Sequence, residues 1–100
     1  MRPEVSLVIG SYNNGEEIRG TLVNVRAYFE KQPYSHEVIV VNDGSTDGTK
    51  AILQEFMPSY PALRVVTNSK NMGKGYSVRR GILEATGLFV FYTDADLAYP

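Results

Sequence analysis

Residues 38–48 read VIVVNDGSTDG and decide the fold class of this 100-residue chain. The run Val38–Val41 is continuous and β-branched, which is typical of a strand buried on both faces of a parallel sheet. A loop of glycine and short polar residues follows at once, and such a loop favours a tight turn that leads into a helix. A buried strand, a polar loop and a helix form the repeating unit of α/β folds.

The same unit recurs along the chain. Further apolar runs occupy residues 5–9, 63–66 and 88–92, and we expect each to be a strand of the same buried kind. Strand starts that are roughly 25–33 residues apart match the size of a βαβ unit, so we predict the order βαβαβαβ and an open, mostly parallel α/β sheet with flanking helices. Gly87 is expected to end the third helix. Apolar residues recur at helical spacing in three segments: Ile18, Leu22, Val25 and Phe29; Ile52, Leu53, Phe56 and Met57; Val78, Ile82 and Ala85.

Composition limits the classes of protein to consider. The chain is 43% hydrophobic and 21% charged, as in an ordinary globular domain. Its formal net charge of −1 argues against nucleic acid as a partner, because a phosphate backbone requires a basic excess. The absence of cysteine excludes disulfides and thiolate metal sites. No apolar run is long enough to span a bilayer and no signal peptide is evident, so we expect a cytoplasmic protein that meets a membrane only through a longer chain.

The loops that follow the four strands form the candidate site, because ligands of open α/β sheets bind outside the carboxyl ends of the strands. All four loops are polar and three are rich in glycine. Three of them present a charge, namely Asp43, Lys74, and the pair Asp94 and Asp96. The loops are residues 10–15, 42–48, 68–75 and 93–96.

Asp94 and Asp96 are the candidate metal ligands. In an extended segment, residues two apart point the same way, so the pair can present two hard oxygen donors on one side of the loop. Without a cation, two such carboxylates would repel each other. The pair is expected at the carboxyl end of a parallel strand, opposite a Gly-Lys-Gly loop that suits an anion such as phosphate. This setting favours a Mg²⁺ or Mn²⁺ site over the alternative, an acidic turn exposed to solvent.

Three other loop residues have two readings each. Asp43 either accepts hydrogen bonds from N–H groups of its own turn or binds a nucleotide base or ribose. Lys74, between Gly73 and Gly75, either binds an anion or belongs to a flexible basic loop. Tyr12 either stacks on a base or covers the end of the sheet.

Two nucleotide-binding motifs are excluded. Residues 10–15 lack the middle glycine of a dinucleotide fingerprint. Gly10 and Gly15 have the spacing of a P-loop, but Glu16 stands where that motif requires lysine.

Four stretches together resemble family 2 glycosyltransferases with the GT-A fold. In order, they are VIGSYNNGEEIRGTL (8–22), VIVVNDGSTDGT (38–49), NMGKGYSVRRGILEATG (71–87) and FVFYTDADLAYP (89–100). The likeness is greatest to the branch that contains dolichyl- and polyprenyl-phosphate hexosyltransferases. It implies transfer of a hexose from a donor of the UDP-glucose or GDP-mannose type, with inversion, to an acceptor such as a lipid phosphate.

The resemblance also implies roles for particular residues. Asp94 and Asp96 would hold Mg²⁺ or Mn²⁺ against the diphosphate of the donor. The first loop of this chain has Gly10 where the family often has proline and Asn14 where it often has glutamate. The residues expected at the nucleotide are Ser11, Tyr12, Asn13, Asp43, Lys74, Arg79 and Asp94.

We expect residues 1–100 to be the nucleotide-sugar-binding part of a longer enzyme, truncated at the C-terminus and inactive on its own. The acceptor site and the general base would lie beyond Pro100. An exposed sheet edge would offer a route to homo-oligomers. The alternative is a non-catalytic α/β module for nucleotide binding or protein interaction.

Overall fold

The structure is a computed structural model, and it describes residues 2–95. The predicted alternation of strands and helices is confirmed. None of the helices in residues 2–95 has the length and apolar character that a membrane span requires. The elements are β1 (Val5–Ser11), α1 (Glu16–Glu30), β2 (His36–Asp43), α2 (Thr49–Phe56), the short 3₁₀ helix η1 (Met57–Ser59), β3 (Leu63–Asn68), α3 (Lys74–Glu84) and β4 (Phe89–Asp94).

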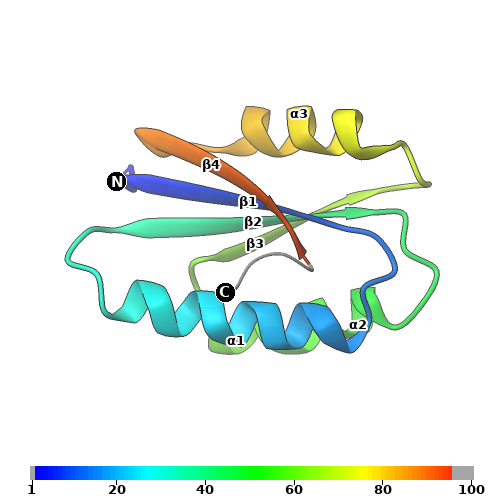
Figure 1. Ribbon diagram of the computed structural model, residues 1–100, viewed down its shortest axis with the longest axis horizontal. Helices are drawn as coiled ribbons and strands as arrows, with labels where there is room; N and C mark the ends of the chain where they lie inside the picture. The colour runs from blue at the N-terminus through cyan, green and yellow to red at the C-terminus, as the bar shows by residue number, and fades with distance from the viewer. Residues whose placement is uncertain (1, 96–100) are drawn as a thin grey trace.

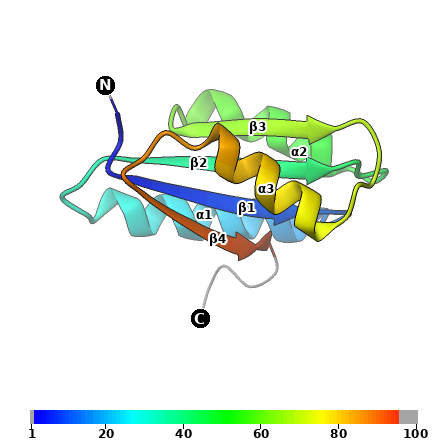
Figure 2. The same cartoon turned by 90° about the horizontal axis from the view of Figure 1, so that it is seen from above.

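The four strands form one parallel sheet in the order β3-β2-β1-β4 (Figure 2). The chain adds β2 and β3 on one side of β1, and α3 then crosses back so that β4 pairs with the other side of β1. The register places Phe89 beside Val5 and Asp94 beside Gly10. The order of strands therefore reverses between β1 and β4, which is where open α/β sheets bind ligands.

The sheet lies between two helical layers, with α1 and α2 on one face and α3 on the other (Figure 1). Successive side chains of a strand point to opposite faces, so each inner strand contributes to two cores. Ile9, Val38 and Val40 pack toward α1 and α2. Val8, Ile39 and Val41 lie on the face that α3 covers. The double burial predicted for residues 38–41 is confirmed, since all four side chains have no exposed surface.

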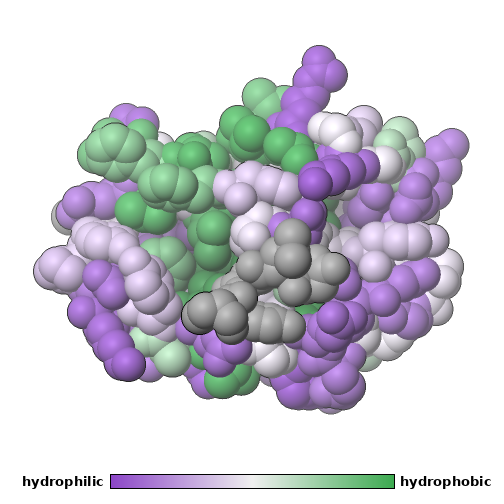
Figure 3. Space-filling model, viewed as in Figure 1, coloured by the Kyte–Doolittle hydropathy of each residue, from purple (hydrophilic) through white to green (hydrophobic). Residues whose placement is uncertain are grey.

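The prediction of a strand buried on both faces was wrong for the run 88–92. β4 is an edge strand, so it has a strand neighbour on one side only within the described chain. Phe89 is 63% exposed and Phe91 57% exposed, and Leu88 and Val90 are exposed as well. Apolar side chains gather on the face of the molecule where β4 lies in front (Figure 3). The sheet thus has the exposed edge that the sequence suggested, and association through it stays a prediction.

The buried face of α3 differs from the predicted one. Ile82 is exposed, and the buried residues are Ser77 and Gly81. A Cβ on Gly81 would clash with Cγ1 of Val8 and lie 3.0 Å from Cγ2 of Val41. The helix therefore uses its smallest side chains to approach the sheet closely, and a search for apolar periodicity selects the wrong face.

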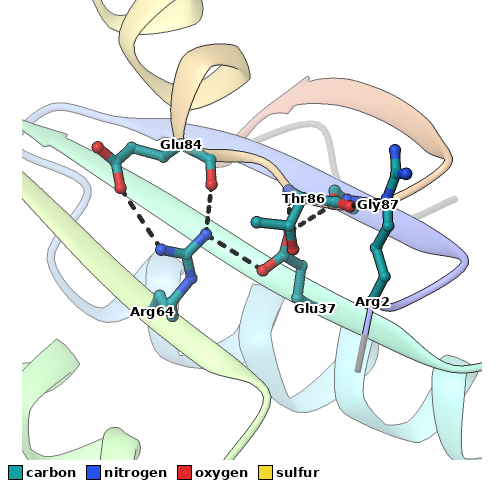
Figure 4. A network of polar contacts seen from close by, with 7 residues as sticks. Arg2, Glu37, Arg64, Glu84, Thr86 and Gly87 are labelled. Atoms are coloured by element: carbon teal, nitrogen blue, oxygen red, sulfur yellow. Dashed lines mark hydrogen bonds and ion pairs between the residues drawn. The ribbon is translucent and has the colours of Figure 1, made fainter.

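A polar network fixes the connection between α3 and β4 at the amino ends of the strands (Figure 4). Oε2 of Glu37 accepts hydrogen bonds from the Ser6 hydroxyl at 2.5 Å and from the Thr86 backbone N–H at 2.7 Å. Arg64 pairs with Oε1 of Glu37 at 3.2 Å and also donates to the Glu84 carbonyl. Burial acts to raise the pKa of Glu37, but the hydrogen bonds from Ser6 and Thr86 outweigh it, so the pKa lies below its usual value.

Gly87 belongs to this network and does not cap α3, which ends at Glu84 with Ala85 in an extended conformation. Its N–H donates to the Ser6 hydroxyl at 2.8 Å. A Cβ at this position would lie 2.5 Å from Oγ of Ser6, so the glycine is required by close approach to β1.

Two of the helical glycines, Gly20 and Gly81, should respond to alanine in opposite directions. Gly81→Ala should destabilise the chain by about 1–3 kcal/mol, because the added methyl overpacks the contact with Val8. Gly20→Ala should stabilise it by about 0.5–1 kcal/mol, because Gly20 is exposed within α1 and nothing lies within 4 Å of its added Cβ. Urea unfolding followed by circular dichroism measures both, and equal effects of the two substitutions would contradict the close packing of α3.

Candidate functional site

A hollow of about 350 Å³ lies where the carboxyl ends of β1, β2 and β4 meet the start of α3. Five of the seven residues predicted at the nucleotide line it: Ser11, Tyr12, Asp43, Lys74 and Asp94. A larger hollow of about 780 Å³ lies against α1 near Phe91, but its lining is mostly apolar and includes no carboxylate. The smaller hollow is therefore the candidate site, because it holds the charged groups and sits at the reversal of strand order.

Asp94 presents its carboxylate at the end of β4, and both of its oxygens are engaged. Oδ1 accepts a hydrogen bond from the Tyr92 hydroxyl at 2.7 Å. Oδ2 pairs with Nζ of Lys74 at 3.1 Å. The hydrogen bond from Tyr92 and the pairing with Lys74 lower the pKa of Asp94 against the opposing effect of burial, so the group is an anion at neutral pH.

Tyr92 was not among the predicted site residues. It shares a face of β4 with Asp94, and its ring packs against the apolar cluster under α3. A Cβ on Gly10 would clash with the Tyr92 hydroxyl, so the missing side chain at Gly10 gives the hydroxyl room to reach Asp94. Burial, together with the hydrogen bond to Asp94, raises the pKa of Tyr92 and keeps the hydroxyl a donor. The i, i+2 spacing of Tyr92 and Asp94 was the signal in the sequence that could have found it.

Asp43 ties the second loop to the third. Its Oδ1 accepts from Nδ2 of Asn68 at 2.9 Å and from the Met72 N–H at 2.7 Å, and its Oδ2 accepts from the Gly73 N–H at 3.0 Å. Burial acts to raise the pKa of Asp43, but these hydrogen bonds outweigh it and lower the pKa. Of the two alternatives for Asp43, hydrogen bonds from its own turn are not what the structure has, because the donors come from β3 and from the loop that carries Lys74. A contact of Asp43 with a base or ribose stays a prediction.

The first loop is held by its own polar side chains. Asn14 accepts hydrogen bonds through Oδ1 from the Ser11 hydroxyl and the Tyr12 N–H, both at 2.9 Å. Asn13 has a φ of 50° and accepts from the Thr46 N–H at 2.8 Å, so it joins the first loop to the second and does not line the hollow. Tyr12 is 46% exposed at the rim, where its ring is available for stacking.

Arg79 lies outside the hollow. It is exposed and lines a separate shallow depression on α3 with Lys74. Its neighbour Arg80 turns toward the sheet and donates to the Thr67 carbonyl at 3.0 Å and to Oδ1 of Asn68 at 2.7 Å. Arg79 therefore lies near Lys74 on α3 but outside the hollow that the other charged predicted residues line, and its contact with the donor stays a prediction.

The predicted metal site can be examined at Asp94 only, because Asp96 lies outside the described residues. Within residues 2–95, no three His, Cys, Asp or Glu side chains gather into a potential metal cluster. Asp94 suits a hard divalent cation, because it is an ionised oxygen donor in an open hollow and already has a cationic partner in Lys74. Thr21 supports this segment from α1 by donating to the Ala95 carbonyl at 2.5 Å.

Comparison with known proteins gives a consistent result. The model of the family described as Glycosyl transferase family 2 matches residues 6–100. A dolichyl-phosphate beta-glucosyltransferase of Trichomonas vaginalis is 35% identical over 96 residues, which cover 91% of this chain and 28% of that protein. The chain thus spans less than a third of the length of this relative.

Two solved structures share the fold. The mannosyltransferase PcManGT from Pyrobaculum calidifontis, in complex with GDP-Man and Mn²⁺, superimposes with a TM-score of 0.84 at 32% identity and covers all of this chain and 29% of its own. S. aureus TarS 1-349, in complex with UDP-GlcNAc, gives 0.78 at 29% identity, over 93% of this chain and 26% of its own. These neighbours confirm the predicted GT-A fold.

The ties made by Asp43 can be tested with an isosteric substitution. Asp43→Asn should destabilise the chain by about 1–3 kcal/mol, because an amide cannot accept from all three N–H donors and leaves one unsatisfied. Asp47→Asn is the matched control, since both hydrogen bonds from Thr49 go to a single oxygen that an amide keeps. Urea unfolding at pH 7 measures both variants, and equal loss in both would contradict this role.

The same ties predict a dependence on pH. The folded pKa of Asp43 lies below the usual 3.8, so its stabilisation is complete above that value and is lost as the pH falls through the folded pKa. The difference in unfolding free energy between the wild type and Asp43→Asn should therefore shrink as the pH falls below about 4. A difference that stays constant between pH 7 and pH 3 would contradict the assignment.

The contact between Gly10 and Tyr92 predicts strong coupling. Gly10→Ala should cost about 1–3 kcal/mol in the wild type, because the methyl displaces the Tyr92 hydroxyl. In the Tyr92→Phe background it should cost at least about 1 kcal/mol less, because the nearest remaining ring atom is 3.3 Å from the added Cβ. Unfolding of the four variants of the cycle gives the coupling energy, and a value near zero would show that Gly10 does not make room for the hydroxyl.

Proposed function

Because the chain belongs to glycosyl transferase family 2, we propose that it forms the donor-binding part of an enzyme that transfers a hexose from a nucleoside diphosphate sugar to an acceptor. The observation that carries the proposal is the pairing of Asp94 with Lys74 in a hollow at the reversal of strand order. This arrangement offers an anion for a metal and a cation for a phosphate within one small volume. Membership of the family favours this function over a non-catalytic binding module.

Different described residues would bind different parts of the donor. Tyr12, which is exposed at the rim, would stack on the base, and Asp43, which lines the same hollow, would contact the base or the ribose. Lys74, the first residue of α3, would bind the diphosphate. Phosphate oxygens match the lysine ammonium and the N-terminal turn of a helix, both of which favour negative charge.

A divalent cation, Mg²⁺ or Mn²⁺, would be held by Asp94 together with Asp96. When bound, it would neutralise the charge that the diphosphate gains as its bond to the sugar breaks. Tyr92 would hold the Asp94 carboxylate in one orientation through the hydrogen bond to Oδ1 and leave Oδ2 directed at the hollow.

The donor and the acceptor are proposed from the relatives. A UDP-glucose or GDP-mannose type of donor agrees with neighbours solved with GDP-Man and with UDP-GlcNAc. A polyprenyl or dolichyl phosphate acceptor agrees with the named dolichyl-phosphate glucosyltransferase relative. Inversion at the sugar by direct displacement is proposed on the likeness to the family, with a general base supplied outside the described residues.

We predict that the chain binds UDP or GDP only when Mn²⁺ or Mg²⁺ is present. Titration calorimetry with each nucleotide, with the metal and then with EDTA, measures this dependence. Asp94→Asn should weaken metal-dependent binding at least about tenfold, because the oxygen that would hold the cation loses its negative charge.

Glu30→Gln is the control for that variant. It makes the same change in net charge, but Glu30 is exposed at the far end of α1, away from the hollow. The control should bind like the wild type. Binding that is equally tight in EDTA, or that Asp94→Asn leaves unchanged, would contradict the proposed function.

A further inference from the structure

The two partners of Asp94 differ in how firmly they are held. Tyr92 is half-buried, and its ring is part of the packed cluster under α3. The Lys74 side chain is 68% exposed, while that of Asp94 is 30% exposed. An ion pair this open to water contributes little to stability, so Lys74 can leave Oδ2 at small cost while Tyr92 stays on Oδ1.

A divalent cation and the Lys74 ammonium would compete for the same oxygen. Two cations cannot share Oδ2 without strong repulsion at this short range. Nζ of Lys74 also lies 5.8 Å from the centre of the Tyr92 ring, so the lysine chain currently lies across the hollow between α3 and β4. Movement of the ammonium away from Asp94 therefore places a free positive charge in the space proposed for the diphosphate.

We propose that Lys74 is an internal counter-cation, which occupies Asp94 until a divalent cation replaces it and then binds the diphosphate of the donor. The proposal rests on the proposed function and adds an order of events to it. No bond is made or broken in this exchange, in which one cation on Oδ2 is replaced by another.

The exchange couples the two ligands. Metal binding by itself must displace Lys74, and nucleotide binding by itself meets a lysine whose charge Asp94 already neutralises. When both bind, the metal frees the Lys74 ammonium for the nucleotide, and the nucleotide's diphosphate takes up the displaced ammonium. Each ligand should therefore raise the affinity of the other. The coupling must be equal in the two directions, because it is a property of one thermodynamic cycle.

The test is Lys74→Met, which keeps an unbranched side chain, one heavy atom shorter, and removes its charge. The variant should bind Mn²⁺ alone several-fold tighter than the wild type, because no ammonium competes for Asp94. It should bind UDP in saturating Mn²⁺ several-fold more weakly, because the Lys74 ammonium that would bind the diphosphate is missing. The electron paramagnetic resonance signal of free Mn²⁺ measures the first affinity, and titration calorimetry with UDP measures the second.

Two further variants control for charge. Lys70→Met makes the same change in net charge on an exposed residue of the same loop, and Lys70 does not line the hollow. It should leave both affinities within about twofold of the wild type. Lys74→Arg restores the cation and should return both affinities toward wild-type values. Thermal unfolding of each variant checks that the fold is intact.

The outcomes separate this inference from the proposed function. If the wild type binds UDP with Mn²⁺ but Lys74→Met leaves Mn²⁺ affinity unchanged or lowers it, the exchange is wrong and the proposed function stands. If Lys70→Met raises Mn²⁺ affinity as much as Lys74→Met does, the effect is one of net charge and the exchange is again wrong. If the wild type binds neither nucleotide with metal, the proposed function fails and this inference fails with it.

Discussion

The parallel pairing of β4 with β1 sets Asp94 level with Gly10, and the whole candidate site depends on this pairing. β4 follows β3 in the chain, yet it lies on the other side of β1, so the chain must cross back over the sheet through α3. That crossing is close because Gly81 and Ser77 bring α3 down onto Val8 and its neighbours. The crossing helix α3 begins with Lys74, which lies in the same hollow as Asp94 at the end of β4.

The amino ends of the strands hold a structural hydrogen-bond network, and the carboxyl ends hold the candidate site. At the amino ends, Glu37 joins Ser6 and Thr86, so the loop that begins β4 is fixed to both inner strands. Both carboxylate oxygens of Glu37 have internal partners, and its side chain is only 12% exposed. At the carboxyl ends, by contrast, the charged groups face a hollow. The rigid end thereby fixes the register that the site at the other end requires.

The sequence was sufficient for those features that depend on local pattern. The continuous run at 38–41 predicted a strand buried on both faces, since such a strand needs apolar residues at every position. The same logic failed for 88–92, because a pattern within one strand does not report how many neighbours the strand has. It failed for α3 because small residues, which carry no apolar signal, make the closest contact. Tyr92 was missed because its role needs the empty space at Gly10, which lies on another strand.

Asp43 and Asp94 show why two acids at equivalent strand ends should differ in function. Both have lowered pKa values, and both line the hollow. Asp43 accepts from two backbone N–H groups and a buried amide, so a ligand that drew it away would leave those donors unsatisfied. Asp94 holds one exposed ammonium that water can solvate when it leaves. Asp94 is therefore the carboxylate suited to a change of partners, and Asp43 is the one suited to hold the loop of Lys74 in place.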